Sequence, residues 1–145
     1  MTLTIDKIKI SSKLEATFAQ DLAEYGLTTQ ILRQTFLEFA LWNDSYEYGK
    51  EVGPLPGKYL WHAHMVPLTQ PISLGKWNKN YEKNQGRCTS DRYIFYAKCE
   101  PILSYLLIDH VIDPGGHNVW LPKYKKAVDA MEKVAEDFYF FQKIP

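Results

Sequence analysis

The run Ile102–Ile112 constrains the fold more than any other feature of this sequence, because it is almost entirely apolar. A strand of this composition has to be covered on both faces, which is typical of a central strand. The segments Tyr59–Val66 and Tyr93–Cys99 also have the pattern of strands. In the latter, Ile94 and Tyr96 share one face, and the alternate residues share the other. The sequence therefore predicts a sheet with helices packed against it.

Two helices are predicted before these strands. Ser12 and Glu15 have the spacing of a capping box, and apolar residues at helical spacing follow until Gly26. Thr28 or Thr29 can cap the second helix, whose apolar residues again recur at helical spacing.

Turn-forming and polar segments separate the predicted elements. Gly49–Gly57 is predicted to be a loop, and so is the long segment Pro67–Asp91, because it shows little periodicity. Asp113–Gly116 is predicted to turn the chain sharply, and a last helix is predicted to begin at Pro122. With a β-rich opening at Leu3–Ile10, the order is strand, helix, helix, three strands, helix.

This order predicts a single α+β domain over residues 1–145, with a small antiparallel or mixed sheet, two N-terminal helices and one C-terminal helix. The formal net charge is zero, so any binding of RNA has to rest on a local basic patch. Cys88 and Cys99 are too few for a disulfide scaffold. No signal peptide or membrane-spanning segment is recognised, so a cytoplasmic protein with free thiols is expected.

Two histidines stand two residues apart in the predicted strand Tyr59–Val66. The side chains of His62 and His64 therefore point to the same face of the sheet. Histidine is the side chain whose ordinary pKa lies nearest to neutral pH. Two neighbouring imidazoles fit either a metal site or an acid–base phosphodiesterase. The alternative for each is a hydrogen-bonded histidine that is half-buried in the sheet.

Five short motifs resemble the YafO-type toxins of bacterial type II toxin–antitoxin systems, and more distantly the RelE/ParE group of small ribonuclease folds. They are a His-x-His strand, a Thr-Ser-Asp turn, a following apolar triplet, a Pro-x-x-His turn and an Ala-Glu-x-Phe in the closing helix. In this sequence they are Trp61–Met65, Thr89–Asp91, Ile94–Tyr96, Pro114–His117 and Ala135–Phe138.

The likeness extends over residues 59–141, with Ser90 in place of the usual asparagine and a neutral chain where related toxins are often basic. The resemblance implies a RelE-like fold and a toxin that inhibits translation by cutting mRNA on the ribosome. It also implies a cognate antitoxin as partner, together with the ribosome and mRNA, and no cofactor.

Acid–base cleavage of RNA needs a base for the ribose 2′-hydroxyl, an acid for the departing 5′-oxygen and a cation near the phosphate. We assign His62 and His64 to the roles of base and phosphate contact, and His117 to the role of acid. Asp91 can orient a histidine, as carboxylates commonly do, or it can close the loop through Asx-turn hydrogen bonds.

Basic side chains around the predicted loop are candidate RNA contacts, interleaved with Trp77 and Tyr81. The same composition also fits a plain solvated loop. Tyr96 is added because it matches the family pattern, although a role in the core is favoured for it. The candidate RNA contacts are Lys76, Lys79, Lys83, Arg87, Arg92 and Tyr96.

Two other classes of function stay open. The three site histidines with Asp91 or Asp109 can be arranged as ligands of a divalent metal in a hydrolase, although no dense carboxylate or thiolate cluster supports this. The chain can also be a non-catalytic binding inhibitor, since it offers no unique nucleophile. The remaining histidine, His110, is expected to share a strand face with Leu106, Ile108 and Ile112 and is predicted to be a buried structural residue.

Overall fold

The computed structural model describes residues 2–43, 45–84 and 87–145, and these form a five-stranded sheet with four α-helices and several short 3₁₀ turns. The strand order is β1-β5-β4-β3-β2. β1 runs parallel to β5, and the other neighbouring strands are antiparallel. The strands are β1 (Ile8–Ile10), β2 (Tyr48–Val52), β3 (Trp61–Met65), β4 (Tyr93–Cys99) and β5 (Ser104–Val111). The α-helices are α1 (Ser12–Asp21), α2 (Thr29–Trp42), α3 (Pro71–Asn84) and α4 (Lys125–Phe141).

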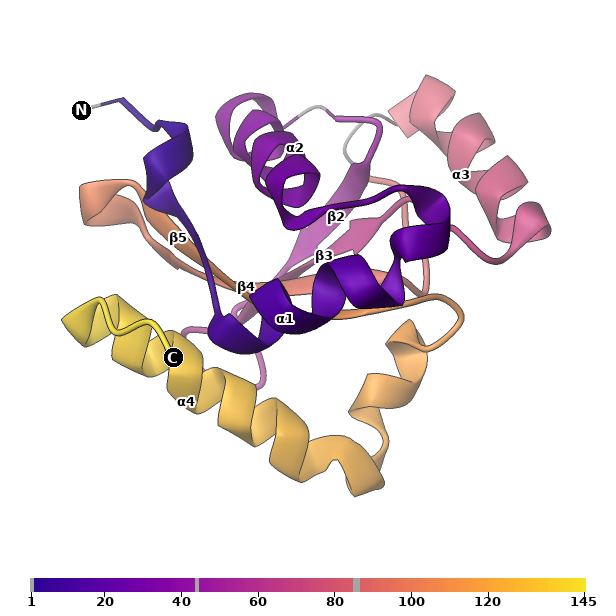
Figure 1. Cartoon of the computed structure of the whole chain (residues 1–145). Helices are drawn as coiled ribbons and strands as arrows, with labels where there is room; N and C mark the ends of the chain where they lie inside the picture. Colours follow the sequence, from indigo (N-terminus) through magenta and orange to yellow (C-terminus); the bar gives the residue numbers. More distant parts are fainter. Residues whose placement is uncertain (1, 44, 85–86) are drawn as a thin grey trace.

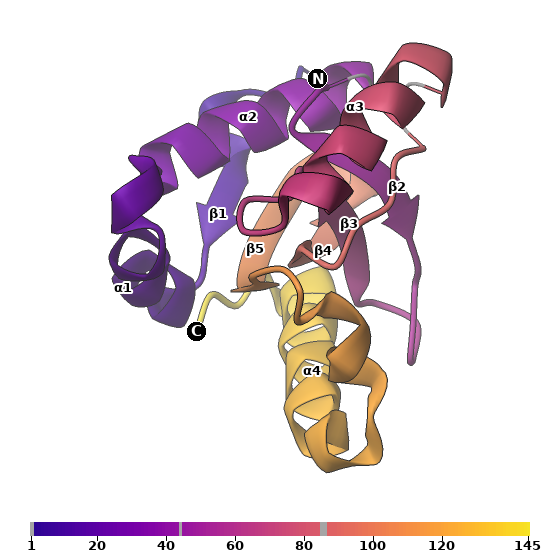
Figure 2. The same cartoon turned by 90° about the vertical axis from the view of Figure 1, so that its right-hand side faces the viewer.

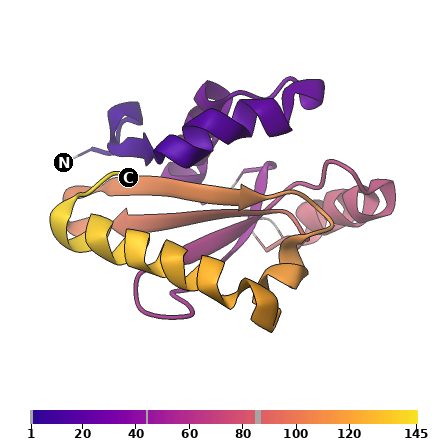
Figure 3. The same ribbon diagram turned by 60° about the horizontal axis from the view of Figure 1, so that its bottom comes forward.

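Helices cover both faces of this sheet. Figure 1 shows α1 and α2 on one side and α4 on the other, and Figure 3 shows α4 lying along β4 and β5. This arrangement confirms the predicted α+β class and the mixed sheet. It also explains why β5, which lies between β1 and β4, is so apolar, because neither of its faces meets water along its central residues.

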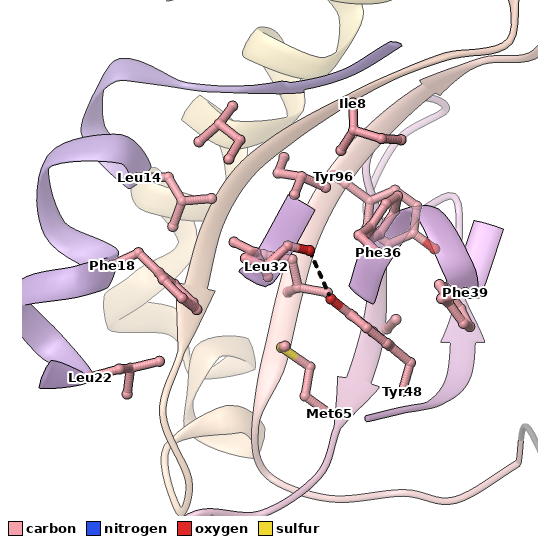
Figure 4. Packing of buried hydrophobic residues seen from close by; sticks show 14 of the residues in the cluster. Ile8, Leu14, Phe18, Leu22, Leu32, Phe36, Phe39, Tyr48, Met65 and Tyr96 are labelled. Atoms are coloured by element: carbon pink, nitrogen blue, oxygen red, sulfur yellow. Dashed lines mark hydrogen bonds between the residues drawn. The ribbon is translucent and has the colours of Figure 1, made fainter. Parts of the chain in front are cut away.

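The core beneath α1 and α2 is built around aromatic rings (Figure 4). Phe36 of α2 is fully buried, and its ring packs edge-to-face on Tyr48, Tyr96 and Tyr105 at centroid distances of 5.8, 4.9 and 5.5 Å. The Tyr48 hydroxyl donates a hydrogen bond to the Leu32 carbonyl at 3.4 Å, which joins β2 to α2. Offset and edge-to-face rings add to the stabilisation that burial gives.

The core beneath α4 holds the alternate residues of the same strands. Phe95 of β4 and Leu106 of β5 meet Ala135 and Phe138 of α4, and all four are buried. The predicted division of Tyr93–Cys99 between two faces is therefore confirmed, with Ile94 and Tyr96 in the other core.

The N-terminal helices begin and end close to the predicted residues. The Ser11 hydroxyl, rather than that of Ser12, caps α1 by accepting a hydrogen bond from the Leu14 N–H at 3.2 Å. The predicted capping box is wrong, because the Glu15 carboxylate accepts a hydrogen bond from the Thr29 hydroxyl instead. Thr28 caps α2, as one of the two alternatives predicted.

Two elements occupy segments that were predicted to be loops. β2 pairs with β3, and its Gly49 is a packing requirement: a Cβ there would lie 2.0 Å from the Cys88 carbonyl oxygen and 2.8 Å from the Trp77 indole. α3 fills most of the segment between Pro67 and Asp91, of which residues 85 and 86 lie outside the described part. Figure 2 shows α3 beside the β2–β3 side of the molecule.

Two smaller expectations also change. The last α-helix begins at Lys125, after a 3₁₀ turn that starts at Pro122. His110 does not share a face with Leu106 and Ile108, because the β4–β5 register shifts between Phe95 and Tyr96. Its ring packs on Phe18 of α1 at 5.0 Å and its Nε2 lies 3.0 Å from an Asp21 carboxylate oxygen, in keeping with a structural histidine.

Replacing Phe36 by alanine is expected to lower the free energy of unfolding by about 3–5 kcal/mol, because it removes the ring on which the α1–α2 core converges. Urea denaturation followed by circular dichroism measures this change. Ile72→Ala is the control, since Ile72 is 79% exposed and should have little effect. Equal effects of the two substitutions would contradict the proposed importance of this ring.

Candidate functional site

Three strand ends meet at one end of the sheet and carry the candidate residues. His64, next to the last residue of β3, pairs with Tyr93, the first residue of β4, and Tyr93 pairs with Val111, the last residue of β5. Asp91 precedes β4 and His117 follows β5, so both lie at this same end. Figure 3 shows α3 and the turns after β5 beyond this end of the sheet.

His62 and His64 project from the same face of β3, as predicted, with ring centroids 5.7 Å apart. Their surroundings differ. The ring of His62 lies among Tyr93, Phe95 and Trp120, at centroid distances of 4.6, 5.6 and 5.4 Å. Burial, with a smaller contribution from nearby His64, lowers the pKa of His62 from its ordinary 6.5 to about 4. His62 is therefore neutral at physiological pH.

The imidazole of His64 is fixed by the backbone of Ser90. Its Nδ1 lies 2.9 Å from the Ser90 N–H and 2.7 Å from the Ser90 carbonyl oxygen. The first group can donate to an unprotonated Nδ1 and the second can accept from a protonated one, so the ring is held in either state. Burial lowers the pKa of His64, and the Ser90 carbonyl and the Asp91 charge partly oppose this effect.

Ser90 is itself held by the ends of the two strands. Its hydroxyl donates to the Met65 carbonyl at 2.6 Å and accepts from the Arg92 N–H at 3.1 Å. The Ser90 side chain therefore links the end of β3 to the start of β4 next to His64.

Asp91 and His117 lie in contact, with His117 Nδ1 3.1 Å from an Asp91 carboxylate oxygen. Both side chains are accessible, at 41% for Asp91 and 65% for His117. The Gly116 N–H donates to the Asp91 carbonyl at 2.6 Å, which fixes the turn that carries His117 against the start of β4. The orienting role predicted for Asp91 is thus geometrically available to it.

A pocket of about 310 Å³ opens between α3 and the start of β4. His64, Lys76 and Asp91 line it, which brings together three residues that were predicted from different parts of the sequence. His62 adjoins the pocket through its contact with Tyr93. The other lining residues, which were not among the residues predicted for the site, are Ser73, Thr89, Ser90 and Tyr93.

The predicted basic residues on α3 lie on one exposed stripe. Lys76, Lys79 and Lys83 follow one another at helical spacing, and Arg87 beyond the helix is exposed as well. Trp77 was expected to be available for stacking but is buried, and its indole N–H donates to the Tyr46 carbonyl at 2.9 Å. It attaches α3 to the body of the protein.

Two predicted RNA contacts, Arg92 and Tyr96, lie away from this pocket. Arg92 is only 2% exposed, and its guanidinium donates to the Val66 carbonyl at 2.9 Å beneath α1 and α2. The Tyr96 ring is fully buried in the same core, and its hydroxyl donates to the Glu51 carboxylate. Tyr93, on the opposite face of the same strand, reaches the pocket instead.

Asp113 closes this end of the sheet, although nothing in the sequence distinguished it from an ordinary turn residue. Its carboxylate accepts hydrogen bonds from the N–H groups of Leu68 and Thr69, each at 2.9 Å. Burial opposes its ionisation, but these bonds and that of the Thr69 hydroxyl hold the pKa of Asp113 below its usual value. The loop into α3 is thereby joined to the turn after β5.

The described residues contain no group of three or more His, Cys, Asp or Glu side chains that could hold a metal ion. The predicted arrangement of His62, His64 and His117 with an aspartate as metal ligands is therefore not found among them. Within the same residues, no helix has both the length and the apolar character needed to cross a bilayer.

A family model described as "Toxin YafO, type II toxin-antitoxin system" matches residues 44–140. This is more than half of the 145 residues. The chain belongs to this family. No curated protein and no solved structure matches it. In this YafO-family toxin, the matched residues include β2, β3, β4, β5, α3 and nearly all of α4. They also include every residue that lines the pocket. Toxins of this class imply an antitoxin as partner.

Gly116→Ala is expected to destabilise this toxin by about 1–3 kcal/mol and to separate His117 from Asp91. A Cβ at residue 116 would lie 2.5 Å from the Asp91 carbonyl oxygen. Gly75→Ala in α3 is the matched control, because a Cβ there meets nothing within 4 Å and alanine favours a helix. Urea denaturation compares the two. If Gly116→Ala were as stable as Gly75→Ala, the close approach at Asp91 would be refuted.

Acid is expected to destabilise the toxin through His62. The pKa of His62 is about 4 in the folded protein and about 6.5 in the unfolded chain. Between pH 4 and 6.5, the His62 imidazole therefore binds a proton in the unfolded chain but not in the folded protein. The contribution of His62 to the free energy of unfolding is therefore fully present above pH 6.5, and it falls by about 3 kcal/mol as the pH drops to 4. His62→Phe keeps an aromatic ring and removes the titration, so its free energy of unfolding should fall less steeply over this range. His64 and His110, whose pKa values burial also lowers, retain their effects in the variant. Equal slopes for both proteins would disprove the assignment.

Proposed function

We propose that this toxin is a ribosome-dependent mRNA endonuclease that cleaves RNA by metal-independent acid–base catalysis. One observation carries the proposal: His64, Asp91 and Lys76 line one pocket, and Asp91 is paired with the accessible His117. A titratable base, a titratable acid and a cation are thus available around a space that can receive a phosphate. Its substrate partners would be mRNA and the ribosome, and its place of action the cytoplasm.

His64 is the proposed base. In the tautomer whose Nδ1–H donates to the Ser90 carbonyl, Nε2 carries no proton and is left for the substrate. The lowered pKa keeps the ring neutral and able to accept a proton near pH 7. In the proposed reaction, Nε2 takes the proton of the ribose 2′-hydroxyl. The 2′-oxygen then attacks phosphorus, and the bond from phosphorus to the 5′-oxygen breaks.

His117 is the proposed acid. Its Nδ1 lies 3.1 Å from an Asp91 carboxylate oxygen, so Asp91 can orient the ring and leave Nε2 to donate a proton to the departing 5′-oxygen. Lys76 supplies a positive charge for the developing negative charge on the phosphate oxygens. His62 cannot supply a proton at neutral pH, so its proposed role is a neutral contact beside Tyr93.

Along α3, Lys79 and Lys83 continue the line of positive charge from Lys76, and Arg87 follows the helix. Since the chain as a whole has no net charge, this stripe is the local field that would attract the RNA backbone.

Induced expression of the wild-type chain in a bacterial host is expected to arrest growth and to produce new 5′-ends within translated messages. His64→Ala and His117→Ala should each reduce cleavage by at least about 100-fold, the usual contribution of one acid–base group. Asn118→Ala, next to His117 and also at an exposed position, is the control and should remain toxic. Melting temperatures show whether each variant is folded.

The outcomes separate the alternatives. Full toxicity of either folded histidine variant would reject the corresponding role. Growth arrest without cleavage would favour a non-catalytic binding inhibitor. Cleavage that is abolished by a chelator would instead favour a metal-dependent hydrolase.

A further inference from the structure

Beside the proposed catalytic pocket, the turns between β5 and α4 expose three large apolar side chains. Trp120, Leu121 and Tyr124 are exposed by 41, 44 and 42%, and we call them the aromatic shelf. Exposed apolar groups gathered in one segment are typical of a binding surface. The mechanism proposed above makes no use of them.

Trp120 is held in place although much of it is exposed. Its indole packs against the rings of His62 and Phe95 at centroid distances of 5.4 and 6.3 Å. Burial raises the pKa of the Tyr93 hydroxyl, and a hydrogen bond with the Trp120 side chain partly offsets this rise. Because Tyr93 also lines the pocket, the shelf is continuous with the proposed catalytic site.

The shelf is also close to the proposed acid. His117 and Trp120 belong to the same 3₁₀ helix, Gly116–Trp120, three residues apart. Side chains at this spacing lie above one another, about 6 Å apart along the helix axis. A group that contacts Trp120 is therefore about one nucleotide away from a phosphate at His117.

We propose that Trp120 is a stacking platform for a nucleobase of single-stranded RNA next to the scissile phosphate. This inference rests on the proposed function. A preformed indole beside imidazoles and a lysine-lined pocket supplies the two features that single-stranded nucleic acid requires, a π-face and positive charge. Lys123, whose Nζ lies 5.1 Å from the ring centre of Tyr124, adds a cation at the outer end of the shelf.

The test measures binding of the full-length toxin to two RNA hexamers, one of uridine and one that lacks bases. Both carry 2′-O-methyl sugars, so that no 2′-hydroxyl is available for cleavage. Trp120→Ala is expected to weaken binding of the uridine hexamer by about 5- to 150-fold, the range for loss of one stacked base. Binding of the abasic hexamer should not change. Trp120→Phe should restore most of the affinity, and the uridine hexamer should quench wild-type indole fluorescence.

Trp42→Ala is the matched control, because Trp42 is 72% exposed at the end of α2, away from the shelf. It should leave the affinity for both hexamers unchanged. Equal binding of the uridine hexamer by wild type and Trp120→Ala would overturn the inference. So would an equal loss for both hexamers, since the effect would then not involve the base.

The cleavage assay separates this inference from the proposed function. If the wild type cuts messages but Trp120→Ala affects both hexamers equally, the stacking role of Trp120 is rejected and the proposed nuclease is retained. Base-dependent binding at Trp120 without any cut message would reject the nuclease and retain the shelf as an RNA-binding surface. Absence of fluorescence quenching by the uridine hexamer would reject RNA as the occupant of the shelf and favour a protein partner.

Discussion

The pairing of β4 with β3 on one side and β5 on the other is the constraint on which the rest of the site depends. It aligns His64 with Tyr93 and Tyr93 with Val111, so three strand ends and their loops meet at one place. The contacts of Ser90 and Gly116 then fix the loops at single positions. Because hydrogen bonds to backbone carbonyls hold these loops, the catalytic candidates gain their positions from the sheet rather than from one another.

Much of the fold could be predicted because its strands and helices bury apolar residues with regular spacing. β4 and β5 and the first two helices follow directly from that spacing. β2 and α3 could not be found in this way, because each buries few of its residues and so shows no regular apolar spacing. A glycine such as Gly49 is usually a sign of a loop. In β2, however, its missing side chain lets the Cys88 carbonyl and the Trp77 indole lie close to the strand. Trp77 is the one side chain of α3 that is fully buried among those described.

The candidate site was predictable in part for a related reason. A two-residue spacing establishes that His62 and His64 share a face, and that Tyr93 and Tyr96 point to opposite faces, but it cannot say which of the two tyrosines lines the pocket. The packing of α2 decides this, since it buries Tyr96 and leaves Tyr93 beside the pocket. Arg92 is a similar case, because a charged residue is usually exposed and this one is enclosed.

Depth in the sheet, rather than residue type, separates the two histidines of the motif. His62 lies among three aromatic rings and its pKa is about 4, so it serves packing and stays neutral. His64 lies two residues closer to the end of β3. There the backbone of Ser90 contacts its Nδ1, and the ring lines the pocket. The burial that makes His62 unreactive also places Trp120 against it, next to the pocket. One buried imidazole thus supports both the proposed base, His64, beside it and the exposed Trp120 beyond it.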